Sequence, residues 1–279
     1  MRRCFIALSA IMLLMFSCTG KKAGQTDEVP TDSVADSTDV AVTDTMELLI
    51  TQTPMPRAAD AMFDDFIFNF VANKKLQKER TVFPLRTTEG GKTVNTKEEQ
   101  WQMERLFMRQ GYYTLLFSDE EQMSLMKDTA VSQAIVEKIQ LKKNRVVNYR
   151  FFRVKGAWMM TSINVTPISE NANASFLNFY QKFVTDSVFQ LESINETVQF
   201  VGPDPDDDFA QMEGVITPDT WEAFAPTLPV KVLYNIVYGK PKAANKEMIF
   251  LMKGVANGLE MELRFKKVGN KWLLMKMTT

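Results

Sequence analysis

The sequence predicts an α+β protein with two equivalent halves, each packing N-terminal helices on a curved antiparallel sheet. Three observations favour this fold class. The phrase YRFFRVKGAWMM at 149–160 returns as LRFKKVGNKWLL at 263–274, aromatic residues recur at helical spacing early in each half, and alternating apolar and charged residues follow. We expect the halves at 59–168 and 169–279, because a repeat period above about 100 residues indicates duplicated domains rather than a solenoid.

Nearly constant spacings relate the two halves. The spacing is 114 residues within the repeated phrase, 113 in the first helix, and 120 between the tryptophans that precede the central strands, so loop insertions separate matching elements. Because the tryptophans occupy matching positions, we expect them in the core of each half. They are Trp101, Trp158, Trp221 and Trp272.

Each half opens with a predicted amphipathic helix, whose apolar residues recur at the i, i+3, i+4 spacing of one helix face. Asp64 and Asp65 lie near the start of the first helix, and lysines follow towards its end, as the helix dipole prefers. The apolar faces are Phe63, Phe66, Ile67, Phe70 and Val71 in the first half, and Phe176, Phe179, Tyr180, Phe183, Val184 and Leu191 in the second.

A short second helix is predicted next in each half. In the first half, Thr96 and Glu99 match a capping box, and in the second half Thr217 is followed by Pro218 at the first helical position. We expect the tryptophan of each half, Trp101 or Trp221, just inside this helix.

Strands are predicted for the remainder of each half. Residues 112–117 and 230–238 are rich in aromatic and branched side chains, and residues 259–266 alternate between apolar and charged side chains, as in a sheet buried on one face. Gly156 and the Gly269-Asn270 pair mark hairpin turns. The final strands follow these turns, at 158–165 and 271–277.

The composition excludes several kinds of chemistry. The 279 residues contain no histidine, and both cysteines, Cys4 and Cys18, lie near the amino terminus. Ser-His-Asp, Cys-His and HExxH sites are therefore excluded, as is a thiol site in the folded part. A net charge of −1 provides no basic field for nucleic acid. We expect no cofactor and no nucleic-acid partner.

Residues 1–17 have the pattern of a lipoprotein signal peptide. Two arginines precede the apolar stretch at 5–16, which is too short to span a membrane as a helix. The segment at 15–18 resembles a bacterial lipobox, although Met15 and Phe16 depart from its usual residues, and a plain signal peptide with a chance cysteine is the alternative. The resemblance implies lipidation of Cys18 and anchoring to the outer membrane, and we favour its periplasmic face.

Residues 18–58 are predicted to form a disordered tether, because they are rich in Thr, Ser, Asp and Val and have no sustained helical or strand period. Three Asp-Ser/Thr-apolar triplets in it resemble the O-glycosylation sequon of Bacteroidetes, and the composition of the tether alone would also produce such triplets. The candidate glycosylation sites are Ser33, Ser37 and Thr45.

The order of elements, with a Gly-x-Trp or Gly-Asn-x-Trp hairpin near the end of each half, resembles the nuclear-transport-factor-two-like (NTF2-like), or cystatin-like, α+β cone. The tandem arrangement behind a lipobox is similar to a family of Bacteroidetes lipoproteins with two such cones. This resemblance covers nearly all of residues 60–279 and carries no catalytic motif. It implies that the tryptophan of each last hairpin, Trp158 or Trp272, fills the core of its cone.

An acidic segment at 202–208 is a weak metal-site candidate. Asp204, Asp206 and Asp208 alternate as the first ligands of a calcium loop do. However, Phe209 and Val215 stand where an EF-hand loop requires Gly and the bidentate Glu. A solvated loop is the alternative interpretation.

Two classes of function remain open. The leading interpretation is a noncatalytic, lipid-anchored module of the periplasm that binds a small hydrophobic ligand or an envelope protein. The alternative is a small-molecule enzyme of the isomerase or dehydratase type, with an Asp/Glu–Tyr pair in one cone, because this chemistry needs no histidine. A cavity with a buried carboxyl group beside a tyrosine hydroxyl would favour the enzyme. We expect a monomer whose two halves form a pseudo-dimeric pair.

Overall fold

The computed structural model describes residues 60–204, 206–244 and 246–279. The signal peptide and tether expected at 1–17 and 18–58, with Cys18, Ser33, Ser37 and Thr45, lie outside the described residues. Within the described part, none of the helices has the length and apolar character needed to cross a membrane.

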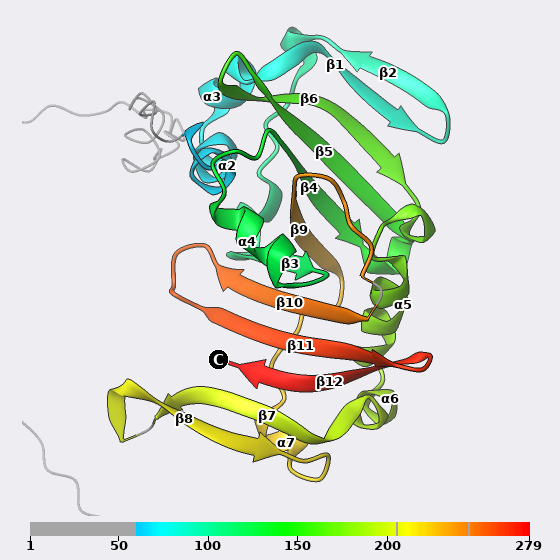
Figure 1. Ribbon diagram of the computed structural model, residues 1–279. Helices are drawn as coiled ribbons and strands as arrows, with labels where there is room; N and C mark the ends of the chain where they lie inside the picture. Colours follow the sequence, from blue (N-terminus) through cyan, green and yellow to red (C-terminus); the bar gives the residue numbers. More distant parts are fainter. Residues whose placement is uncertain (1–59, 205, 245) are drawn as a thin grey trace, which may run out of the picture. The chain divides into compact units, whose positions relative to one another are not determined.

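The two halves contain similar series of elements: two helices, a hairpin, a short helical segment and four strands (Figure 1). The first half consists of α2 (Phe63–Ala72), α3 (Lys74–Glu79), β1 (Thr81–Glu89), β2 (Lys92–Thr96), η2 (Glu98–Gln100), η3 (Leu106–Arg109), β3 (Tyr112–Phe117), α4 (Glu120–Ser124), η4 (Leu125–Lys127), β4 (Gln133–Gln140), η5 (Leu141–Lys143), β5 (Arg145–Val154) and β6 (Ala157–Thr166). The second consists of η6 (Ile168–Glu170), α5 (Ala174–Phe183), α6 (Ser187–Glu192), β7 (Ile194–Asp204), β8 (Asp207–Ile216), α7 (Trp221–Phe224), β9 (Val232–Tyr238), β10 (Glu247–Gly254), β11 (Glu260–Val268) and β12 (Lys271–Thr278).

The strands of both halves join in one twelve-stranded sheet, in the order β2-β1-β6-β5-β4-β9-β3-β10-β11-β12-β7-β8. Two strands cross between the halves. Strand β9 pairs with β4 from Ala134↔Tyr238 to Gln140↔Val232, and β3 pairs with β10. The exchanged strands meet at the single parallel pair Thr114↔Asn235. The expectation of a separate sheet in each half is corrected by this pairing.

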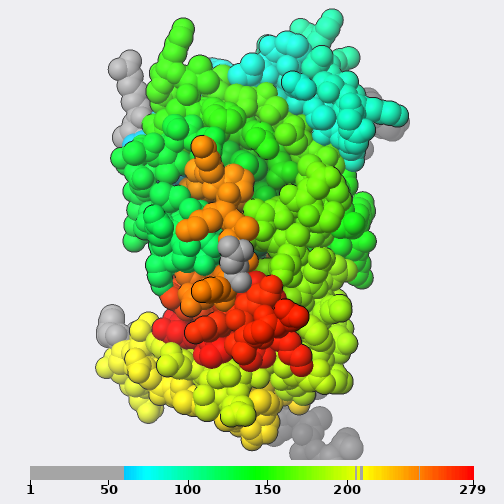
Figure 2. Space-filling view, turned by 45° about the vertical axis from the view of Figure 1, so that its right-hand side comes forward, coloured from blue at the N-terminus to red at the C-terminus, as the bar shows by residue number. Residues whose placement is uncertain are grey.

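The connection between β9 and β10 also reaches across the first half. Figure 2 shows this orange segment against the green surface of the first half. The backbone N–H of Gly239 donates to the carbonyl of Gln133 at 2.9 Å, and the ammonium of Lys242 lies 2.7 Å from the carboxylate of Asp119. Contacts outside the strands therefore also join the second half to the first.

The predicted face of the first helix is confirmed, because the five apolar residues of α2 are all buried. In the second half Phe176, Phe179, Tyr180 and Phe183 of α5 are buried as expected. Val184 is only partly buried, and Leu191 is wrongly placed on this face, because it lies on α6 and is 43% exposed. Phe151 of β5 packs against three of the α2 residues, with ring centroids 5.3, 5.9 and 5.2 Å from those of Phe63, Phe66 and Phe70, in edge-to-face geometry. The second half repeats this cluster around Phe265, whose centroid lies 5.3, 5.6 and 5.4 Å from those of Phe176, Phe179 and Phe183.

The repeated hairpins carry a tryptophan into each core. Gly156, with φ of 84°, occupies the turn before β6, where a left-handed conformation favours glycine. The ring of Trp158 packs edge-on to Phe63 at 4.9 Å, and the guanidinium of Arg153 lies 4.8 Å from its centroid. The residues 114 positions later, Trp272 and Lys267, repeat the cation-over-ring contact at 5.9 Å. Trp221 is also buried, whereas Trp101 is partly buried.

The short helical segments differ from the expected ones. In the first half, the N-cap is Lys97, whose backbone N–H donates to the side chain of Gln100, so the expected capping box from Thr96 to Glu99 is displaced by one residue. Trp101 follows this short turn instead of lying inside it, and α7 begins only at Trp221.

The hairpins at 81–96 and 194–216 were not predicted as strands. The reason is physical: β2 is exposed at four of its five residues, so it lacks the apolar alternation that marks a half-buried strand. The acidic segment at 202–208 belongs to the second hairpin and spans its turn.

Candidate functional site

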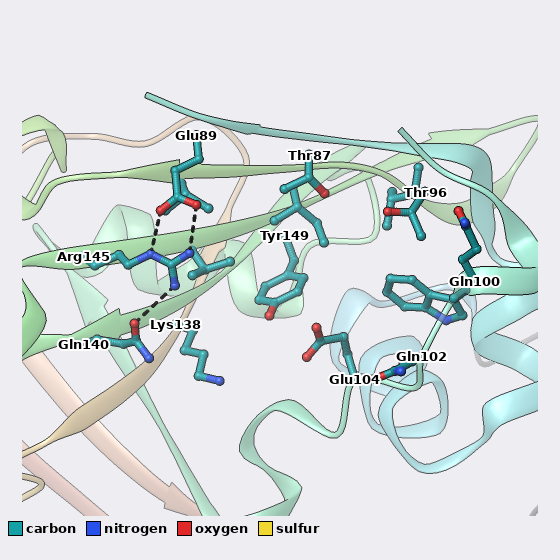
Figure 3. Close-up of a pocket in the computed structure, with 15 residues that line it drawn as sticks. Thr87, Glu89, Thr96, Gln100, Gln102, Glu104, Lys138, Gln140, Arg145 and Tyr149 are labelled. Atoms are coloured by element: carbon teal, nitrogen blue, oxygen red, sulfur yellow. Dashed lines mark hydrogen bonds and ion pairs between the residues drawn. The ribbon is translucent and has the colours of Figure 1, made fainter. Parts of the chain in front are cut away.

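The first half contains a cavity of about 470 Å³ between the sheet and the segment that follows β2 (Figure 3). Tyr149 and Val147 of β5 line it, on the face of the sheet that presents Phe151 to α2, because alternate residues of a strand share a face. Side chains from β1, β4, β6 and residues 96–104 complete the lining.

A carboxyl–tyrosine pair lies in this cavity. The hydroxyl of Tyr149 points towards the carboxylate of Glu104 in Figure 3. Burial, and next the negative charge of Glu104, raise the pKa of Tyr149 well above its usual range. The phenol therefore keeps its proton and directs it towards the carboxylate.

Glu104 is held in place through its backbone by Gln77 of α3. The side-chain amide of Gln77, which is 0% exposed, donates to the carbonyl of Glu104 at 2.8 Å and accepts from its N–H at 3.0 Å. Two reciprocal hydrogen bonds to a buried amide position the loop that carries the carboxylate. Gln77 was not predicted as a functional residue. The available signal was a polar amide at a helix position that is buried.

Four charged side chains line the cavity. Arg145 pairs with Glu89 through two hydrogen bonds of 3.0 and 3.3 Å and also donates to Gln140. The ammonium of Lys138 lies 5.8 Å from the ring centroid of Tyr234, on the exchanged strand β9. Within the described residues, neither Lys138 nor Glu104 has an oppositely charged group within 4.0 Å.

The second half has apolar side chains at the matching positions. Lys138 and Tyr149 correspond to Met252 and Leu263, 114 residues later, and Glu104 corresponds to Phe224, 120 residues later. Met252 and Leu263 are buried in the hydrophobic core around Trp221. At these three positions the polar side chains are therefore specific to the first half.

The two helical amides also differ. Gln190 lies 113 residues after Gln77 and accepts a hydrogen bond of 3.0 Å from the indole N–H of Trp221. Trp221 is 1% exposed. In the first half Gln77 holds Glu104 instead, and Trp101 lines the cavity. The buried indole N–H of Trp101 has no hydrogen-bond partner within the described part of the chain.

A second carboxyl–tyrosine pair lies outside the lining of this cavity. The hydroxyl of Tyr238 on β9 donates to the carboxylate of Asp64 on α2. Burial is the main cause that raises the pKa of both groups. This pair joins the first helix to the exchanged strand, and its role is structural.

The weak metal candidate lies at the turn between β7 and β8. The backbone N–H of Asp206 donates to the carboxylate of Asp204 at 2.9 Å, and the side chain of Asp208 is outside the described part. Across the residues that the structure describes, no group of three or more Asp, Glu, His or Cys side chains is arranged to hold a metal ion. Metal binding stays a prediction that only a titration tests.

A buried polar cluster lies where the two halves exchange strands. Glu137 of β4 accepts hydrogen bonds of 2.8 Å from both Asn171 and Asn235. Asn235 also accepts from the backbone N–H of Leu116 on β3 at 2.9 Å. Burial raises the pKa of Glu137, and the two amide donors oppose that shift.

Glu137→Gln is expected to remove a pH dependence of unfolding. Because the folded pKa of Glu137 is raised above 4.5, the stability that its proton contributes is present below the unfolded pKa and lost as pH rises through the folded pKa. Relative to wild type, the variant should therefore gain stability as the pH rises above about 4.5. Urea unfolding at several pH values measures this difference. Glu196→Gln, at an exposed position, is the control, and a pH-independent difference for Glu137→Gln would contradict the assignment.

The fold places the chain in the NTF2-like class of α+β proteins, as the sequence predicted. A crystal structure of an NTF2-like protein from Bacteroides fragilis is 42% identical, with a TM-score of 0.72, and the similarity covers 81% of this chain and 98% of that one. Residues 42–279 match the family described as a domain of unknown function, DUF4348, and the chain belongs to this family. No protein with a curated description matches it.

Proposed function

We propose that this protein is a noncatalytic envelope module that binds a small ligand in the cavity of its first half. The observation that carries the proposal is the difference between the halves. Glu104, Lys138 and Tyr149 line the cavity, whereas the matching residues of the second half are apolar. Charged side chains beneath a sheet reduce stability unless they are compensated, which supports a role in binding. The charged lining favours a polar ligand over the hydrophobic ligand expected from the sequence.

We further propose that each half is an NTF2-like cone that donates one strand to the other. Matching element order and nearly constant spacings of 113 and 114 residues support two copies of one ancestral unit. In this arrangement the chain is a monomer that mimics a strand-exchanged dimer. Anchoring through Cys18 to the periplasmic face of the outer membrane rests on the lipobox-like residues before that cysteine.

Replacing cavity residues by their second-half counterparts is expected to abolish ligand binding while the fold is retained. The variants are Lys138→Met and Tyr149→Leu, because the second half carries Met252 and Leu263 at these positions. We expect a small-molecule library, screened by ligand-observed NMR, to contain compounds whose affinity falls at least tenfold in both variants. Lys271→Met, at an exposed position that lines neither this cavity nor the pocket of the second half, is the matched control. Equal binding to all four proteins would contradict the proposal.

The alternative function is a small-molecule isomerase or dehydratase, and the Glu104–Tyr149 pair favours it. Glu104 would take a proton from the substrate, while Tyr149 would donate a hydrogen bond to the developing oxyanion. Glu104→Gln separates the two functions: an enzyme would lose substrate deuterium exchange in heavy water while still binding, whereas a binding module catalyses no exchange in either form.

A further inference from the structure

The charges of the cavity indicate the chemistry of its ligand, if the proposed binding function holds. Arg145 and Glu89 neutralise each other through their two hydrogen bonds. Among the described residues of the lining, one cation, Lys138, and one anion, Glu104, then remain. Figure 3 shows them on either side of the Tyr149 hydroxyl, Lys138 reaching from β4 and Glu104 from the segment before η3. The cavity thus presents two separated charges of opposite sign.

Such an arrangement favours a ligand with both charges. Partly buried charges are costly unless they are paired, and charge-assisted hydrogen bonds are about twice as strong as neutral ones. A singly charged ligand would compensate only one of Lys138 and Glu104. A neutral sugar would hydrogen-bond to both and compensate neither.

The remaining lining suits an ammonium group near Glu104. Trp101 lies three residues before Glu104 and lines the same cavity, and aromatic faces attract ammonium groups. The volume of about 470 Å³ falls in the usual range of small-molecule sites and accommodates more than the smallest amino acids.

We propose that the cavity binds a zwitterion, either a free amino acid or a short peptide. Its ammonium group pairs with Glu104 beside Trp101, and its carboxylate pairs with Lys138. The hydroxyl of Tyr149 lies between the two charges.

The test uses isothermal titration calorimetry on the folded chain with defined probes. The probes are the twenty L-amino acids and the dipeptides alanyl-alanine, alanyl-glutamate, alanyl-lysine and alanyl-phenylalanine. Any probe that binds is then titrated again in three blocked forms: the N-acetylated form, the C-terminal amide and the doubly blocked form. N-acetylglucosamine and glucose are the neutral comparison. We expect at least one zwitterion to bind and each single block to weaken binding at least tenfold.

Two variants assign the charges. The Lys138→Met variant should bind the free acid and its C-terminal amide equally, because the ammonium group that pairs with the ligand carboxylate is gone. The Glu104→Gln variant should bind the free amine and its N-acetylated form equally, because the carboxylate that pairs with the ligand ammonium group is gone. Lys271→Met should retain wild-type affinities. Circular dichroism verifies that each variant is folded, and Lys138→Gln replaces Lys138→Met if the latter is not.

The outcomes separate the two proposals. Failure of every zwitterion to bind, or blocks that leave affinity unchanged, would overturn the zwitterion assignment. If a sugar or library compound then binds and the cavity variants weaken it, the binding function stands without the zwitterion. If no compound binding depends on these residues, both proposals fail.

Discussion

A chain of residues 59–168 alone is expected to fail as a stable monomer. In the full chain, β9 covers one edge of β4 through seven paired residues, and β10 covers β3. Without the second half, these edges are unpaired, and exposed interior strands promote association. Glu137 also loses Asn171 and Asn235, its two hydrogen-bond donors. A buried carboxyl group without partners adds to the cost.

Size-exclusion chromatography with light scattering measures this outcome. We expect the isolated segment to be unfolded, aggregated or dimeric, because two copies restore the exchanged pairing only as a dimer. Mixing it with residues 169–279 should restore a one-to-one complex with the circular dichroism spectrum of the intact chain. A monomer of 59–168 with cooperative unfolding would show that β3 can pair with β4 inside one half, and the exchange would then be dispensable.

Phe151→Ala and Phe265→Ala are each expected to lower the free energy of unfolding by about 3–5 kcal/mol. Each ring is at most 1% exposed and packs against three aromatic rings of the opening helix of its half. Truncation would remove those contacts and leave a cavity in a close-packed core. Because one sheet joins the halves, both variants should unfold in a single transition.

Urea unfolding followed by tryptophan fluorescence and circular dichroism measures both effects. Phe152→Ala is the matched control, because this neighbouring side chain is 38% exposed and its loss should change stability by about 0.5 kcal/mol or less. Separate transitions for the two halves, or a small effect of one core substitution, would contradict the picture of one cooperative sheet with two equivalent cores.

The spacing of apolar residues was sufficient to predict a helix or a strand wherever one face of that element is apolar. The five buried residues of α2 and the alternation around Leu263 identify a helix and a strand without further information. The hairpin turns at Gly156 and Gly269 were equally clear, because both need a positive φ. The same reasoning missed β2, since an exposed edge strand carries no such pattern.

The cavity was only partly visible in the sequence. The expectation of an Asp/Glu–Tyr pair in one cone assigned neither of its two residues. Glu104 reaches Tyr149 because Gln77, 27 residues earlier in the chain, holds the backbone of Glu104. Comparison of the halves would have offered a signal, since Lys138 and Glu104 match Met252 and Phe224. A position that is polar in one half and apolar in the other indicates that the two halves differ in function there.

The sequence alone was enough for the repeated order of elements, most of the apolar faces of the opening helices and the terminal hairpins, because these depend on local spacing and on side chains a few residues apart. Only the tertiary structure decided which strands pair. Strands β3 and β9 are both short and largely buried, and backbone hydrogen bonds do not distinguish one apolar partner from another. The choice of β10 for β3 and of β4 for β9 depends on long-range packing and on polar contacts such as that between Asn235 and Glu137, which exist only once the halves have come together.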